Sequence, residues 1–311
     1  MKNIKTLLVL GLSFGLFFTA CENGNSDVDL NDDDLEVAAQ VAADALSDDS
    51  EGLMAALYDA SASVGSTSMN HRFGVEESND KSDLNLVESA STPGGRGAER
   101  NYSHSYDPAT GEHTISFSRS FTRTGFTKTM EGSATHVYTD TLGEYVEFPR
   151  QNRDAIETAT YVATKTGSME GEVRNGSFER SHNLSLAGLS EQSAITTVNG
   201  TQSGSGSYAG PNRDGDDIER QWSNSFTFTN IQLDKAVIEE NGTIEAGITG
   251  TFDYDVNIIR AVNGGEPEVT ELEGTIELTG DGTALLEFKG AARIFRIALG
   301  RGSVSETNRR R

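Results

Sequence analysis

The chain of 311 residues contains one cysteine, few prolines and an excess of acidic over basic side chains. A single cysteine excludes a disulfide within the chain. The 48 acidic residues outnumber the 25 lysines and arginines, and the only basic run is Arg309–Arg311 at the C-terminal end. Because binding to nucleic-acid phosphates needs clustered basic side chains, we expect no nucleic-acid partner. The same charge disfavours electrostatic binding to anionic lipid headgroups.

Long apolar runs are also absent. The longest, Leu7–Phe18, is too short to span a bilayer as a helix, which takes roughly 20 residues. Lysines precede it, and this order is typical of a secretory signal peptide. The next residues, Phe18-Thr19-Ala20-Cys21, resemble the lipobox of bacterial lipoproteins. The resemblance implies that residues 1–20 are removed as a lipoprotein signal peptide and that acyl chains such as palmitate are attached to Cys21.

Lipidation at Cys21 implies that the protein is anchored in the cell envelope. Two or more acyl chains hold a protein stably at a membrane, and we expect this to be the outer membrane. The resemblance leaves open whether the protein faces the periplasm or the cell surface. The alternative is an ordinary signal peptide with Cys21 as a free thiol, which is a liability in an oxidising compartment.

Composition divides the chain after Cys21 into segments. Residues 21–32 are rich in Asn, Gly, Ser and Asp and predict an acidic tether. In residues 33–64 apolar side chains recur every three or four positions, which predicts two short helices whose alanine-rich faces pack on a larger partner. Residues 65–99 are polar without a period and predict a loop or linker. Residues 300–311 predict a flexible tail.

Apolar and polar residues alternate through residues 100–299, which is the period of strands with one buried face. The clearest example is Thr243–Ile258. Asn-Gly pairs at Asn175, Asn199 and Asn241 predict tight hairpin turns. We therefore predict a mainly β fold of roughly ten antiparallel strands, either a sandwich or a curved open sheet or half-barrel, preceded by the two helices.

The C-terminal part contains Gly280-Asp281-Gly282-Thr283, then Phe288-Lys289-Gly290 and the apolar run Ile294–Leu299. These segments resemble the C-terminal hairpins of uncharacterised β-rich lipoproteins of the Bacteroidota. The resemblance implies a series of hairpins and no particular activity.

Acidic residues crowd one glycine-containing loop. Asp214, Asp216 and Asp217 lie there, and carboxylate oxygens are ligands that calcium prefers. They are the candidate metal-ligating residues, with a solvated turn as the alternative. His104 and His113 flank one predicted hairpin and could meet, but no third ligand lies nearby in the sequence. We expect no cofactor.

Catalytic motifs are absent, including Gly-x-Ser-x-Gly, His-Glu-x-x-His and phosphate-binding glycine loops. Ser78 and Lys81 with Lys165-Thr166-Gly167 match elements of penicillin-recognising enzymes, but the polar sequence around Ser78 predicts no helix to carry them. Carboxylate pairs such as Asp253 with Asp255 would suit a hydrolase, which is a distant alternative. We predict no catalytic residue and no enzyme activity.

These observations predict a membrane-anchored envelope lipoprotein with a non-catalytic structural or binding role. Its more specific form is a carrier of an apolar ligand, such as a lipid, in a cavity lined by Phe226, Phe252 and Tyr254. The alternative is a surface module that binds polysaccharide or protein, for which an exposed Trp222 would be the sign. The sequence leaves the ligand unknown.

Overall fold

The computed structural model describes residues 32–61, 98–149, 151–212 and 215–307. The predicted signal peptide, Cys21 and most of the predicted tether and linker lie outside the described residues.

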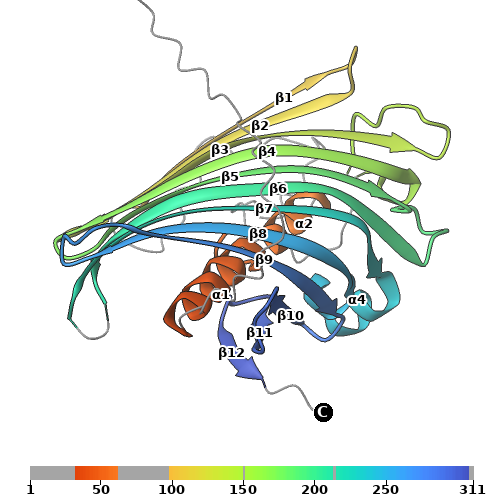
Figure 1. Ribbon diagram of the computed structural model, residues 1–311. Coiled ribbons are helices and arrows are strands. Elements are labelled where there is room, and N and C mark those ends of the chain that lie inside the picture. The colour runs from red at the N-terminus through yellow and green to blue at the C-terminus, as the bar shows by residue number, and fades with distance from the viewer. Residues whose placement is uncertain (1–31, 62–97, 150, 213–214, 308–311) are drawn as a thin grey trace, which may run out of the picture.

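The described residues form one antiparallel sheet of twelve strands (Figure 1), in which each strand pairs with its neighbours in sequence. The strands are β1 (Ala98–Asp107), β2 (Glu112–Arg123), β3 (Phe126–Asp140), β4 (Ile156–Gly171), β5 (Asn175–Ala187), β6 (Ile195–Pro211), β7 (Asp217–Asp234), β8 (Ile248–Val262), β9 (Glu268–Thr279), β10 (Thr283–Phe288), β11 (Ile294–Ala298) and β12 (Val304–Thr307). The mainly β prediction is confirmed, and the architecture is the curved open sheet rather than the sandwich.

Two helices lie under the arch of the sheet, α1 (Asp32–Leu46) and α2 (Leu53–Ser61) (Figure 1). Helix α1 contacts β7, β8, β11 and β12, whereas α2 contacts β4 and β5. The predicted alanine-rich faces are buried, because small side chains let a helix approach a sheet closely. The turn between the helices is equally tight, since a Cβ atom at Gly52 would overlap the carbonyl group of Ala45.

Side chains of the sheet alternate between this packed inner face and an outer face exposed to solvent. In β8, for example, Phe252, Tyr254 and Val256 are buried and the residues between them are exposed. Burying the apolar inner face against the helices supplies the main driving force for folding.

The Asn-Gly pairs are not hairpin turns. Asn175 begins β5, and Asn199 lies inside β6, where the register with β7 shifts between Val198 and Gly200. Gly242 ends helix α4 (Lys235–Asn241) in a left-handed conformation with φ 73°. Glycine adopts that conformation without the steric cost that a Cβ atom brings, so the same dipeptide suits a helix end, a bulge or a turn.

Two further segments differ from the sequence-based expectation. Residues 243–258 do not form one strand, because the short 3-10 helix Ile244–Ala246 precedes β8. Within the predicted tail, β12 pairs with β11, and its Val304 lies opposite Ile297. The described residues also contain the 3-10 helix Arg153–Ala155. Strand β12 forms because β11 offers backbone groups to pair with, which local sequence does not reveal.

Candidate functional site

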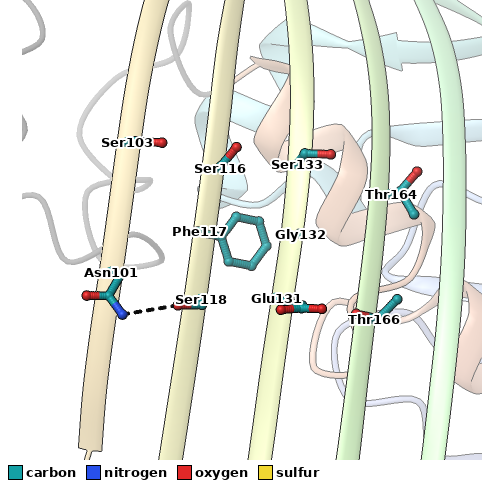
Figure 2. Close-up of a pocket in the computed structure, with 10 residues that line it drawn as sticks. All are labelled: Asn101, Ser103, Ser116, Phe117, Ser118, Glu131, Gly132, Ser133, Thr164 and Thr166. Carbon is teal, nitrogen blue, oxygen red and sulfur yellow. Dashed lines mark hydrogen bonds between the residues drawn. The ribbon is translucent and has the colours of Figure 1, made fainter.

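Small polar side chains cover the outer face of β1–β4 in rows that cross the strands. The first row consists of Ser103, Ser116, Ser133 and Thr164, which are direct cross-strand neighbours. The second row, two residues further along each strand, consists of Asn101, Ser118, Glu131 and Thr166. Figure 2 shows both rows, with the covered helices on the far side of the sheet.

A groove of about 490 Å³ runs between these two rows. Phe117 and Gly132, which lie between the two rows, also line it (Figure 2). The ring of Phe117 lies against Gly132 on the inner side, where a Cβ atom would come within 2.8 Å of the ring. Because Phe117 and Gly132 both occupy inward positions, no side chain of either fills the space between the two rows on the outer face.

A second groove of about 690 Å³ adjoins the first and is lined by residues of β1–β6. It shares the second row, which continues through Glu179 and Ser205. A third row forms its other wall and consists of Ser120, Thr129, Ser168 and Ser177. Hydrogen bonds fix parts of the walls, because Thr129 Oγ1 lies 2.7 Å from Ser168 Oγ and Asn101 Nδ2 donates to Ser118 Oγ over 3.2 Å.

Aromatic rings support this second groove from the inner side. The ring of Phe178 covers Gly167, and the ring of Trp222 covers Gly206. Trp222 is therefore half-buried on the inner face rather than displayed over the outer face. The charged side chains that face outward along the groove lining are Glu131 and Glu179. The grooves are thus rich in hydroxyl groups and mildly acidic.

Beneath the helices lies a buried ion cluster around Lys165, which β4 directs inward. Lys165 Nζ donates to Asp59 Oδ2 of α2 over 2.6 Å and to Glu51 Oε2 over 2.9 Å. Burial alone would lower the pKa of Lys165, but the two carboxylates outweigh burial and hold this pKa above its ordinary value. The ammonium group therefore stays charged and connects the sheet to the helical segment.

Side chains of the sheet donate hydrogen bonds to carbonyl oxygens at the C-terminal end of α1. Arg180 Nη1 donates to the carbonyl oxygen of Asp44 over 2.5 Å, and Gln202 Nε2 donates to that of Ala45 over 2.6 Å. These carbonyl groups have no partner within the helix. A cation near this end also interacts favourably with the helix dipole.

Histidines gather near the start of the sheet. His104 Nε2 lies 3.4 Å from His113 Nδ1, as the sequence suggested. His113 Nε2 contacts the carbonyl oxygen of Val146, and His136 Nδ1 contacts Tyr138 Oη over 2.7 Å. Within the described ranges, no group of three or more His, Cys, Asp or Glu side chains is arranged to hold a metal ion. The burial of His113 and His136 is thus matched by hydrogen-bond contacts with a backbone carbonyl group and a tyrosine hydroxyl group.

The predicted metal-ligating residues lie at the end of a hairpin. Asp214 is outside the described residues. Asp216 Oδ1 accepts a hydrogen bond from Asn263 Nδ2 over 3.0 Å, and the backbone N–H of Asp217 donates to Asn263 Oδ1 over 2.9 Å. These bonds connect the start of β7 to the end of β8, and the calcium site stays a prediction.

The aromatic residues expected to line a carrier cavity belong to the packed core. Phe226, Phe252 and Tyr254 are at most 5% exposed. The Phe226 ring centroid lies 5.1 Å from that of Tyr254 and 5.6 Å from that of Phe252. These rings pack against one another and belong to the same core cluster as the apolar residues of α1 and α2.

The sequence reasoning missed the outer rows. Ser116, Ser118 and Ser120 were visible as the polar face of one strand, but their alignment with the neighbouring strands depends on register. No protein-family model matches the chain, and searches among curated proteins and among solved structures found no match. No helix among the described residues has the length and apolarity needed to cross a bilayer.

Proposed function

We propose that the protein is a lipid-anchored envelope protein that binds a neutral polysaccharide in the grooves of its outer face, without catalysing a reaction. The observation that carries the proposal is the pair of adjoining grooves walled by hydroxyl side chains. Sugar hydroxyl groups both donate and accept hydrogen bonds, as do serine and threonine. The outward Glu131 and Glu179 add acceptors and disfavour an anionic polymer.

The dimensions of the grooves favour an extended ligand. Together they cross β1–β6, and six strands spaced about 4.8 Å apart span roughly 24 Å. A polymer that lies across the strands can contact successive hydroxyl groups along one row. The polymer also needs no deep cavity, which agrees with the packed inner face. This arrangement supports a surface module over a carrier of apolar ligands.

Affinity gel electrophoresis of the mature, lipid-free chain in gels containing neutral glucan, mannan or xylan tests the proposal. We expect at least one neutral polymer to retard the protein. Ser118→Leu should weaken retardation at least fivefold, because it removes a hydroxyl group shared by both grooves. Ser225→Leu is the matched control, since Ser225 is exposed on the outer face of β7 outside both grooves. Retention only by anionic polygalacturonate, or equal loss in both variants, contradicts the proposal.

The lipid anchor is tested separately in cells. Cys21→Ser should abolish metabolic labelling with palmitate and release the protein from the membrane fraction. Persistent labelling of this variant would show that the acyl chain is attached elsewhere or that the lipobox resemblance is misleading.

A further inference from the structure

Four inward side chains on β5–β8, those of Arg180, Gln202, Asn224 and Tyr254, carry buried polar atoms that lack a hydrogen-bond partner. We call these residues the inner polar site, and each is at most 6% exposed. The atoms concerned are Arg180 Nε, Gln202 Oε1, Asn224 Oδ1 and Nδ2, and Tyr254 Oη. Such groups are rare in folded proteins and are normally satisfied by protein or by ordered water.

Sheet register places these residues in two neighbouring rows. In one row Arg180 lies opposite Gly204, which lies opposite Asn224. In the other row Gln202 lies opposite Phe226, which lies opposite Tyr254. Gly204 contributes no side chain, and a Cβ atom there would lie only 3.1 Å from Asn224 Oδ1. The space over Gly204 is therefore bordered by Asn224 and by the edge of the Trp222 ring, which lies 3.5 Å from the same position.

The side chains cannot simply turn toward one another. Arg180 Nη1 and Gln202 Nε2 are held by carbonyl oxygens of α1, Asp44 and Ala45 respectively. Rotation of either side chain would leave an end of α1 without its partner. Asp44 lies close enough to interact electrostatically with both Arg180 and Tyr254.

The energy of these unpaired atoms argues for a guest molecule. Each buried group without a partner costs about 1–3 kcal/mol. Five such atoms would together cost an amount comparable with the roughly 5–15 kcal/mol by which a domain is stable. A folded sheet with this inner face therefore needs something else to complete its hydrogen bonds.

The chemistry of the guest follows from the mixture of atoms. Arg180 and Asn224 offer N–H donors, while Gln202 offers a carbonyl acceptor, and Tyr254 can serve as either. An anion would satisfy the donors but face the acceptors of Gln202 and Asn224. A cation would face Arg180. Hydroxyl groups, which donate and accept at the same atom, match the full set.

We propose that the inner polar site, beneath the C-terminal end of α1, binds a small uncharged molecule through hydroxyl groups. Water and a small polyol such as glycerol share this chemistry. The inner polar site lies on the opposite face of the sheet from the outer grooves, so the two proposals are tested independently of each other.

A crystal structure of the mature, lipid-free chain at high resolution, grown without polyols, is the first test. We expect electron density within hydrogen-bond distance of Asn224, Gln202 and Tyr254. A chain of water molecules or a retained polyol would support the site. Density for an anion, or side chains that pair with one another around a dry interior, would overturn it.

Thermal unfolding with added glycerol distinguishes the two sources. If a polyol occupies the site, the melting temperature of the wild-type chain rises saturably with glycerol, and Asn224→Leu removes that saturable part. If water alone occupies the site, the variant and the wild type respond alike while the crystal structure shows ordered water. Asn183→Leu, on the exposed face of β5, is the matched control. The wild-type crystal structure decides the proposal even if Asn224→Leu fails to fold.

Discussion

Replacing Lys165 by methionine tests whether the buried ion cluster holds the helices on the sheet. The side chain of Lys165 is 2% exposed and that of Asp59 is 6% exposed, and their charged atoms lie 2.6 Å apart. Methionine has a similar length but carries no charge. The variant therefore leaves the carboxylates of Asp59 and Glu51 in the interior without their cation.

Desolvation sets the size of the expected effect. An exposed ion pair contributes little, whereas removal of one partner from a buried pair costs about 3–5 kcal/mol, because the remaining charge stays out of water. We expect Lys165→Met to lower the free energy of unfolding by about that amount. Adding Asp59→Asn should restore part of the loss, since the amide keeps an acceptor for Tyr161 Oη and removes one negative charge.

Urea unfolding, followed by fluorescence of the lone Trp222, measures these differences. Lys289→Met is the matched control. Lys289 Nζ also lies 2.9 Å from a carboxylate, Glu273 Oε2, but its side chain is 79% exposed. We expect no measurable change in the control. If both single variants lose the same small amount, the reasoning about burial is refuted.

Two further predictions concern pH and packing. Burial lowers the pKa values of His136 and His182 to about 3, so each is neutral when folded and gains a proton on unfolding below its usual pKa of about 6.5. The free energy of unfolding should therefore fall by about 2 kcal/mol for each histidine between pH 6.5 and pH 5. In urea titrations, His136→Gln and His182→Gln should each reduce this pH dependence. Gly167→Ala should lower the free energy of unfolding by about 1–3 kcal/mol, because the new methyl group overlaps the ring of Phe178. Gly300→Ala, whose methyl group meets open space, is the control in thermal melts. Equal changes in melting temperature for the two variants would contradict the prediction.

Local pattern predicted the elements better than their ends. The alternation in Thr243–Ile258 predicted a strand with one buried face. The strand spans Ile248–Val262, and the apolar residues that the two ranges share are its buried residues. The Asn-Gly pairs failed as turn signals, because Gly242 ends a helix and Gly200 lies at a bulge. Helix ends, bulges and hairpin turns can all contain a residue with positive φ. Which of them forms depends on the neighbouring strands.

In the candidate sites too, local sequence predicted which residues share a face, whereas their alignment with other strands and helices required the structure. Serines at every second position of β2 predicted a polar face, but pairing with β1 and β3 was needed to align Ser103, Ser116 and Ser133 into one row. Lys165 stood in the sequence as part of an accidental motif. Only the docking of α2 showed that its ammonium group lies between two carboxylates.

The sequence by itself determined the mainly β fold, the two alanine-faced helices and the prediction of a lipid on Cys21, because each depends on residues close together in the chain. Tertiary structure decided that the sheet stays open and curves around the helices, that Phe226 and its neighbours fill the core, and that the outer hydroxyl groups border grooves. These properties depend on register and packing between residues far apart in the chain, which a short-range pattern does not specify.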